Sequence, residues 1–290
     1  MIEHRVADGV QAMSLARYLS RSWPMVPSRA WKDILKRRDV RVNGAKCGGE
    51  ATVTARDLLK IYIDEKYIDS AIGVIYQDEQ LLVADKPSGL PVDVDSDGIG
   101  ADTLLQRAQA QYPKARLCHR LDAGTGGAVI LSLNDVAHDE LLAAFAGHGI
   151  EKRYQAIVCG CPEPLQGKLS AYLMKDADSA KVRIYDHAGA GRLSIETRYR
   201  VIDPNYRDGL SLIEIELITG RTHQIRAHMA HIGHPLIGDD KYGDRPMNRE
   251  HPAKHPQLWC VSLAIEAGGN LKTYSGMRFE SAPQFTIKDD

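Results

Sequence analysis

The spacing of apolar residues near the start of the chain predicts two short helices. Ser14–Arg21 and Ser28–Arg38 fit helices joined by a proline-containing loop, and the serine that opens the second is expected to be its N-cap. In that helix Trp31, Ile34 and Leu35 stand at i, i+3 and i+4 and form one apolar stripe. A helix with such a stripe packs it against a core and leaves the opposite face to solvent.

Alternating patterns after these helices predict strands. Asp39–Asn43, which runs into an Asn-Gly turn, and Leu58–Ile63 are the strand-like runs of the N-terminal part. Beyond about residue 72 the expected elements are strands at Leu81–Ala84, Ala128–Leu133, Tyr154–Val158 and Ser211–Ile218, a helix at Asp135–Ala146 capped by Asn134, and a hairpin at Leu258–Phe279 turning at Gly268-Gly269-Asn270. Because strands outnumber helices and do not alternate with them regularly, the pattern favours an α+β fold over a doubly wound sheet.

Charge divides the chain into two unequal parts. The 290 residues carry a formal charge of −1, which alone argues against a polyanionic partner, yet residues 1–63 are +6 and the remainder is −7. Arg29, Lys32 and Lys36 lie at i, i+3 and i+7, roughly opposite the apolar stripe of the second helix. Most charged helix faces are simply solvated, but basic residues on both helices and the following turn favour contact with nucleic acid.

The cysteines, the amino terminus and the hydropathy profile favour a cytoplasmic location. The cysteines are odd in number, form no C-x-x-C pair and lack zinc-type spacing with histidine, and they are Cys47, Cys118, Cys159, Cys161 and Cys260. The first residues lack the apolar core of a signal peptide, and no run of about 18 apolar residues predicts a membrane span.

Three loops combine polar side chains with turn glycines where strands end, a place where functional groups often lie. They are Val83–Val92, His119–Gly127 and Thr219–Arg226. From the local pattern alone, Asp122 is either a turn-capping residue or a catalytic carboxylate, and Arg221 and Arg226 are either surface residues or part of a site. The glycines after Asp122 match neither a P-loop nor G-x-G-x-x-G, so nucleotide binding has little support.

Four histidines near the third loop call for a test of metal binding. His223, His228, His231 and His234 are spaced by 5, 3 and 3 residues, with no H-E-x-x-H motif and no Glu among them. On a helix the first two would diverge. We therefore predict no metal site and expect these histidines to form hydrogen bonds or to contact an anionic partner.

At these loops the sequence resembles the RluA-like pseudouridine synthases, a family that modifies ribosomal and transfer RNA. The motifs VADKPSGLPV, HRLDAGTGG, EKRYQAIV and LITGRTHQIRAHMAHIGHPLIGDDKYG follow one another in the family's order between residues 72 and 290. The segment 14–64, with SRAWKDILKRRDVRVNG, resembles an S4 RNA-binding domain. The resemblance implies an α+β catalytic domain at 72–290 with a central, mostly antiparallel sheet, a small α+β S4-like domain at 1–66, and a short linker near 64–71.

The resemblance gives three residues a catalytic role. Asp122 would be the catalytic carboxylate and would act on the target uridine either as a nucleophile or as a base. Arg221 would pair with Asp122 and keep it ionised and oriented. Tyr154 would stack on the detached uracil and is the candidate for removing the C5 proton, although from the pattern alone it is a strand residue facing a core.

The resemblance also points to residues that would contact RNA. Arg120 would enter the RNA stack as the uridine flips out, with a phosphate contact as the alternative. Lys86 is expected either at the RNA backbone or as a support of its loop. Arg226 is expected among the substrate-binding residues, and the S4-like domain would contribute Arg29, Lys32 and Lys36. The chain departs from the family at Gly126, where many members carry serine, a change expected to alter loop order or a hydrogen bond near Asp122 while leaving activity in place.

Together these features imply an RNA pseudouridine synthase that needs no organic cofactor and no metal. The partner would be structured RNA, large-subunit ribosomal RNA before transfer RNA, with the uridine in a loop or bulge. We expect a monomer without an obligate protein partner. The alternatives left open are a transfer-RNA enzyme and a non-catalytic RNA-binding or ribosome-associated protein of the same fold.

Overall fold

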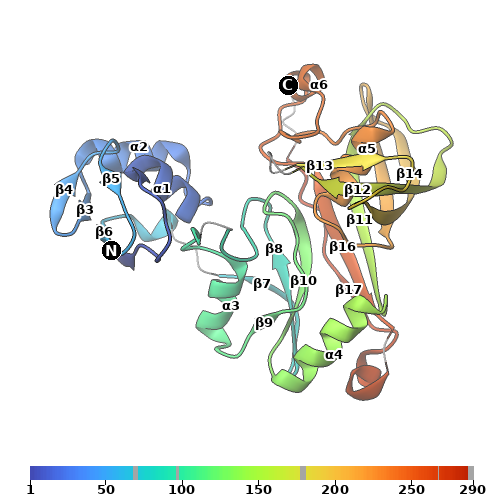
Figure 1. Ribbon diagram of the computed structural model, residues 1–290, viewed down its shortest axis with the longest axis horizontal. Helices are drawn as coiled ribbons and strands as arrows, with labels where there is room; N and C mark the ends of the chain where they lie inside the picture. Colours follow the sequence, from blue (N-terminus) through green and yellow to red (C-terminus); the bar gives the residue numbers. More distant parts are fainter. Residues whose placement is uncertain (68–70, 96–97, 177–180, 267, 287–290) are drawn as a thin grey trace. The chain divides into compact units, whose positions relative to one another are not determined.

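The computed structural model describes residues 1–67, 71–95, 98–176, 181–266 and 268–286, which form two compact units (Figure 1). The first consists of Met1–Ile72 and Gly89–Pro113, and the second of Gly73–Ser88 and Lys114–Asp290. The expected linker near 64–71 lies partly outside the described residues. Segment 89–113, which the sequence placed in the catalytic domain, belongs to the first unit.

Specific contacts tie segment 89–113 to the first unit. The Ala101 N–H donates to the Ser22 carbonyl at 3.0 Å, and Arg107 donates to the Ala71 carbonyl at 3.1 Å. Such pairing across a long sequence separation leaves no trace in local periodicity, so the sequence did not predict it.

The first unit packs two helices and two small sheets around one core. The helices are α1 (Leu15–Ser22) and α2 (Ser28–Arg37), with α3 (Leu104–Gln111) in the second segment and a 3₁₀ turn at Glu65–Tyr67. One antiparallel sheet has the order β1 (Ile2–Arg5), β6 (Leu58–Ile61), β3 (Val40–Val42), β4 (Ala45–Cys47), and β2 (Met13–Ser14) pairs with β5 (Thr52–Val53). The core joins helix residues Leu19 and Trp31 to sheet residues Val40 and Leu59.

Helices α1 and α2 match the sequence-based prediction within a residue, whereas α3 was not predicted. The Ser14 hydroxyl caps α1 by accepting from the Arg17 N–H at 3.4 Å. The predicted cap at Ser28 is wrong, because Ser28 is the first helical residue and the N-cap, Pro27, makes no side-chain hydrogen bond.

The second unit is built on an 11-stranded sheet, which confirms the predicted α+β fold with a mostly antiparallel sheet. Its main path runs β13 (Val182–Tyr185), β12 (Gln166–Lys175), β14 (Leu193–Arg207), β15 (Leu210–Leu217), β11 (Ile150–Cys159), β16 (Leu258–Ile265), β10 (Gly126–Ser132), β8 (Leu81–Lys86), β7 (Gly73–Gln77). Off this path, β17 (Arg278–Glu280) pairs with β16, and β9 (Arg116–Leu117) pairs with β10. Among these pairings only β10 with β16 is parallel, and both strands are almost entirely buried.

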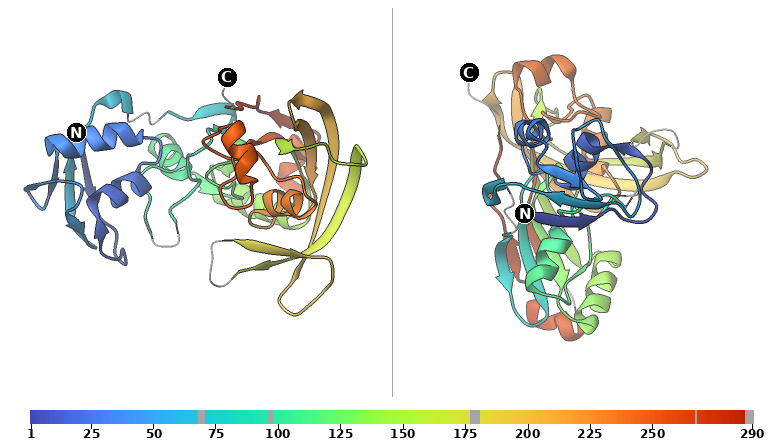
Figure 2. Two further views of the ribbon diagram at one scale, coloured as in Figure 1. Left: turned by 90° about the horizontal axis from the view of Figure 1, so that it is seen from above. Right: turned by 90° about the vertical axis from the view of Figure 1, so that its left-hand side faces the viewer.

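Three helices accompany this sheet. α4 (Asp135–Ala146) packs against β10 and is capped by Asn134, whose side chain accepts from the Ala137 N–H at 2.9 Å, as predicted. α5 (Gln224–His231) packs against β13 and β14, as Figures 1 and 2 show, and α6 (Arg245–Glu250) follows it. The predicted hairpin near the C-terminus pairs β16 with β17, but its connection holds a 3₁₀ turn at Gly269–Tyr274 and residue 267 lies outside the described part. In the described ranges, each helix is too short or too polar to span a bilayer.

Candidate active site

Asp122 lies in the loop between β9 and β10, where buried neighbours fix its backbone. The His119 ring, three residues before Asp122, stacks on Phe145 with 4.4 Å between the ring centroids. It also accepts a hydrogen bond from the Ile130 N–H at 2.9 Å. Burial lowers the pKa of His119 to about 3, so the ring is neutral and can accept. The Asp122 side chain remains 26% exposed at the end of this anchored loop. It is therefore held in place but open to a substrate.

Lys86 is a fully buried support of the same loop, so the predicted contact with the RNA backbone is wrong. Its ammonium donates to the carbonyl oxygens of Pro87 and Ala123, both at 3.1 Å, and thus joins the first two motif loops. Burial lowers the pKa of Lys86 to about 7, and the charge of Asp122 opposes this shift. The loop-stabilising alternative fits this position.

The glycine at position 126 is explained by a tryptophan. A Cβ atom on Gly126 would overlap the indole ring of Trp259, its register partner on β16. That ring is buried, and its Nε1 donates to the Ser281 hydroxyl at 2.6 Å. The Trp259 ring fills the space that a serine side chain at position 126 would need. The departure from the family is therefore explained by packing between neighbouring strands of the sheet.

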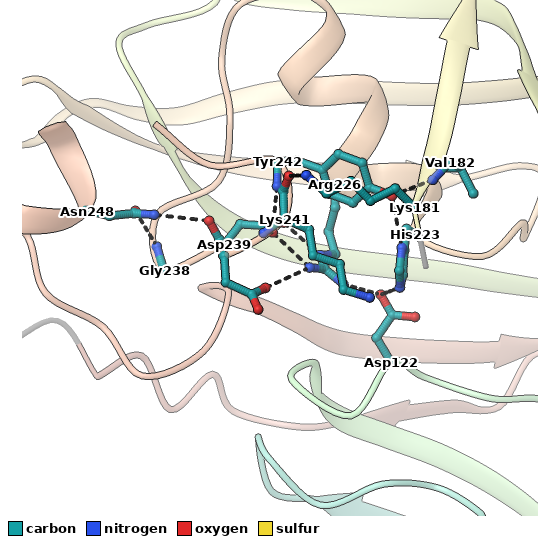
Figure 3. A network of polar contacts seen from close by, with 11 residues as sticks. Asp122, Lys181, Val182, His223, Arg226, Gly238, Asp239, Lys241, Tyr242 and Asn248 are labelled. Atoms are coloured by element: carbon teal, nitrogen blue, oxygen red, sulfur yellow. Dashed lines mark hydrogen bonds and ion pairs between the residues drawn. The ribbon is translucent and has the colours of Figure 1, made fainter. Parts of the chain in front are cut away.

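The guanidinium that meets Asp122 belongs to Arg226 and not to Arg221 (Figure 3). Arg226 Nη1 donates to Asp122 Oδ2 at 3.1 Å from the first turn of α5. Arg221 precedes the helix, and its side chain is exposed while its backbone N–H donates to Gln224 Oε1 at 3.1 Å. The helix begins at Gln224, so residue 226 faces inward and residue 221 stays in the preceding turn. The predicted pairing of Arg221 is wrong.

Arg226 is only 6% exposed, so its guanidinium serves the neighbouring carboxylates and not the predicted contact with substrate. A second carboxylate holds it, because Arg226 Nε and Nη2 donate to the two oxygens of Asp239 at 2.7 and 2.8 Å. Asp239 Oδ1 also accepts from the backbone N–H groups of Lys241 and Tyr242 at 2.9 and 3.1 Å. Burial alone would raise the pKa of Asp239, but these hydrogen bonds and the Arg226 charge hold it below its usual value.

The contact between Asp239 and Arg226 was not predicted from the sequence. The available signal was its place in GDDKYG, directly after a buried Leu-Ile pair. From α6, Asn248 accepts from the Gly238 N–H at 2.8 Å and donates to the Asp239 carbonyl at 3.0 Å, which fixes this turn (Figure 3).

His223 lies between Asp122 and Tyr242. Its backbone is left-handed, with φ 53°, as it leads into α5. Its Nε2 is 3.9 Å from Asp122 Oδ2, and its Nδ1 is 3.0 Å from the Tyr242 hydroxyl. Burial lowers the pKa of His223, and the negative charge of Asp122 opposes this shift. The ring of Tyr242 also lies near Arg226, with 5.4 Å between its centre and the guanidinium carbon.

The other three histidines each have a different partner, in agreement with the predicted hydrogen bonds. His228 Nδ1 lies 3.1 Å from Thr197 Oγ1, His231 Nε2 lies 2.8 Å from Asp186 Oδ1, and His234 Nδ1 lies 2.9 Å from the Cys159 carbonyl oxygen. Within the described ranges, no three His, Cys, Asp or Glu side chains are grouped as metal ligands would be.

Tyr154 is 5% exposed on β11, at a register shift where it faces Cys260 of β16. Burial raises the pKa of Tyr154 well above its usual value, and a hydrogen bond to the Cys260 thiol and the nearby Asp122 charge act in the same direction. Its hydroxyl is therefore uncharged at neutral pH. The side chain of Arg120, by contrast, is exposed next to the buried Leu121.

Two surfaces carry exposed or half-buried cations. In the second unit, a cavity of about 410 Å³ beside Asp239 is lined by four of them, Lys181, Lys241, Arg245 and Arg249. In the first unit, Arg29, Lys32 and Lys36 are exposed on α2, and the buried side of that helix carries Ala30, Trp31, Ile34 and Leu35. The predicted division of α2 into an apolar and a basic face is confirmed.

Comparisons with known proteins agree with the fold and the motifs. A family model described as RNA pseudouridylate synthase matches residues 80–231. A Zymomonas mobilis protein named ribosomal large subunit pseudouridine synthase D is 37% identical over 208 residues, which cover 69% of this chain and 63% of that protein. The chain thus spans less than two thirds of that relative.

A shorter relative is covered more completely. A Salmonella typhi protein named dual-specificity RNA pseudouridine synthase RluA is 31% identical over 202 residues, 69% of this chain and 90% of that protein. The solved structure of human RNA pseudouridylate synthase domain containing 1 has the same fold, with a TM-score of 0.59 over 76% of this chain and 84% of that one, at 22% identity. The chain belongs to the RNA pseudouridylate synthase family, and it is an RNA-modifying isomerase of that family.

Proposed function

We propose that Asp122 starts the isomerisation of a uridine in structured RNA, with Arg226 as the hydrogen-bonding partner that orients its carboxylate. In the net reaction, the bond from ribose C1′ to uracil N1 breaks, a bond from C1′ to C5 forms, N1 gains a proton and C5 loses one. The observation that carries the proposal is a partly open carboxylate bound by a buried guanidinium, which itself is fixed by Asp239. Asp122 acts either by adding to the nucleotide or by removing a proton.

The uridine must leave the RNA stack to reach this carboxylate, because the glycosidic carbon is inaccessible in a stacked base. Arg120, two residues from Asp122, is assigned to fill the vacated position in the RNA, and the exposure of its side chain supports this role. Tyr154 is assigned to packing against the uracil ring. Its raised pKa keeps the phenol protonated, so removal of the C5 proton by a Tyr154 phenolate is disfavoured.

Phosphate contacts are assigned to the two cationic surfaces. The cavity lined by Lys181, Lys241, Arg245 and Arg249 borders Asp239 and suits the RNA backbone near the target nucleotide. The basic face of α2 suits a second stretch of backbone, which supports the S4-like role of residues 1–66. Neither contact needs a net positive chain, because RNA affinity depends on local positive surface.

Large-subunit ribosomal RNA is the proposed target, since the relative with 37% identity is named for that substrate. Transfer RNA is the second candidate, because the resembled family also modifies transfer RNA and the relative covered over 90% of its length is named for dual specificity. We further propose a cytoplasmic monomer without an obligate protein partner, and all five cysteines are free thiols, as a reducing compartment requires.

The test is the Asp122→Asn variant of the full chain. Release of tritium from RNA labelled at uracil C5 reports the reaction, and we expect a loss of about 10³-fold or more in rate with unchanged thermal unfolding. Fragments of large-subunit ribosomal RNA and a set of transfer RNAs serve as parallel substrates. A variant that works at the wild-type rate would refute the role of Asp122, and turnover of transfer RNA alone would move the target to the second candidate.

A further inference from the structure

We propose that Tyr242 and His223 position Asp122 so that Oδ1 is the carboxylate oxygen that reacts with the uridine, an inference that rests on the catalytic role proposed above for Asp122. Neither residue needs to touch RNA for this function. Both act through the carboxylate, as a chain of hydrogen bonds that begins on β13 and ends beside Asp122 (Figure 3).

The chain begins at the Tyr242 hydroxyl, whose oxygen accepts a hydrogen bond from the Val182 N–H at 2.7 Å. The same hydroxyl lies 3.0 Å from His223 Nδ1. In the described part of the structure, His223 Nδ1 is the one acceptor within hydrogen-bond distance of the Tyr242 proton. The arrangement that satisfies every group therefore has the hydroxyl donating to Nδ1.

This donation fixes the tautomer of His223. A neutral imidazole that accepts at Nδ1 carries its proton on Nε2. That N–H faces Asp122 Oδ2 at 3.9 Å, too far for a full hydrogen bond but close enough for attraction between the N–H dipole and the carboxylate.

The Arg226 guanidinium and the His223 N–H thus approach the same oxygen of Asp122. Arg226 Nη1 donates to Oδ2 at 3.1 Å, and His223 Nε2 approaches Oδ2 as well. Among the described residues, none offers a hydrogen bond to Oδ1. A carboxylate whose Oδ2 is engaged from two sides has one preferred rotation, and the remaining lone pairs, those of Oδ1, are available to the substrate.

Burial lowers the pKa of His223 and favours its neutral form, while the surrounding charges act in both directions. Facing it are the carboxylates of Asp122 and Asp239 and the cations of Arg226 and Lys241, while Lys181 Nζ lies 5.9 Å from the centre of the Tyr242 ring. Protonation would place a proton on Nδ1 and force the Tyr242 hydroxyl to give up its only acceptor. Loss of the hydroxyl removes that obstacle, so His223 should accept a proton at higher pH.

The first test compares Tyr242→Phe with Tyr274→Phe in the full chain. The phenylalanine keeps the ring beside Arg226, whereas Tyr274 is a buried tyrosine that donates to Asp78 at 2.6 Å and serves as the matched control. For Tyr242→Phe we expect kcat to fall about 10-fold, KM for RNA to change less than about 2-fold, and the NMR titration of His223 to move up by about 0.5 to 1 pH unit. For Tyr274→Phe we expect none of these changes.

The second test uses two amides at position 223. The glutamine amide nitrogen reaches the place of Nε2, and the asparagine amide reaches only that of Nδ1, so we expect His223→Gln to retain about 10-fold more activity than His223→Asn. Equal activity of the two variants, or a fall in kcat for Tyr242→Phe without movement of the His223 titration, would overturn the positioning role. Retained activity in Asp122→Asn would instead refute the proposed function, so the two failures are distinguishable.

Discussion

Helices α2 and α5 both carry basic side chains from sequence motifs linked to RNA, yet these side chains lie in opposite environments. On α2, the side chains of Arg29, Lys32 and Lys36 are exposed. On α5, Arg226 is 6% exposed and bound to two carboxylates, those of Asp122 and Asp239. The same type of side chain is thus a surface cation in one unit and an internal counter-ion in the other.

Packing explains the difference. α2 buries one stripe and leaves the rest of its surface to solvent, whereas six of the eight residues of α5 are buried, Gln224, Ile225, Arg226, Ala227, His228 and Met229. A guanidinium taken out of water needs hydrogen-bonded anions around it, and Asp239 supplies two bonds where Asp122 supplies one. An arginine in a motif of an RNA-modifying enzyme can therefore be assigned as an RNA contact only after its burial in the folded protein is known.

Removing the buried arginine should give the largest effect. In Arg226→Gln the carboxylate of Asp239 stays buried without its partner, so we expect the free energy of unfolding to fall by about 3–5 kcal/mol. Turnover should fall by about 10² or more, because Asp122 loses its charged partner as well. Unfolding in guanidinium chloride measures the first effect and tritium release from labelled RNA the second.

The matched control is Arg221→Gln, five residues away in the same motif. Its side chain is exposed, so stability should change by less than about 0.5 kcal/mol. If Arg221→Gln removed activity as completely as Arg226→Gln, the observed pairing with Asp122 would not describe the working enzyme.

The contrast between Arg221 and Arg226 also shows what could not be predicted from the sequence. Periodicity predicted α4 with its Asn134 cap and the two faces of α2, because those features depend on neighbours within a few residues. The pairing of Asp122 with Arg226 joins residues 104 positions apart. Nothing in GRTHQIR shows that the helix starts at Gln224, which turns Arg226 inward and leaves Arg221 outside.

Packing against distant residues set other features in the same way. The glycine at 126 follows from Trp259 on a parallel neighbouring strand, and the burial of Lys86 follows from the meeting of two loops. The catalytic role proposed for Asp122 rests on the family motif, and the structure adds the side chains that contact its carboxylate.

Neutralising the exposed face of α2 should give the next largest effect, on RNA binding alone. In the triple variant Arg29→Gln, Lys32→Gln, Lys36→Gln we expect the affinity for RNA near 150 mM salt to fall by about 100-fold. The slope of the logarithm of the binding constant against the logarithm of the salt concentration should become less negative by about 2–3. Stability should be unchanged within about 0.5 kcal/mol, since none of these side chains is buried.

A charge-preserving variant, Arg29→Lys with Lys32→Arg and Lys36→Arg, controls for the shape of the side chains. It should bind RNA with nearly wild-type affinity and slope. Equal affinity of the glutamine triple variant and the wild type would show that the α2 face does not contact RNA, and the S4-like role of residues 1–66 would lose its support.

The smallest expected effect is on protein stability at acidic pH. It tests whether the ion pair between Arg226 and Asp239 behaves as a buried pair. The pKa of Asp239 in the folded chain lies below its ordinary value of 3.8, so its stabilising contribution is complete above about pH 4 and is lost as pH falls through the folded value. The unfolding free energy of the wild type should therefore drop more steeply below pH 4 than that of Asp239→Asn, and the gap between the two should narrow. Because the Asp239 side chain is fully buried, 1 M salt should hardly alter this difference, whereas it would screen an exposed pair. If the difference in unfolding free energy between the wild type and Asp239→Asn did not depend on pH, or vanished in 1 M salt, the ion pair would behave like the solvent-exposed charges of α2.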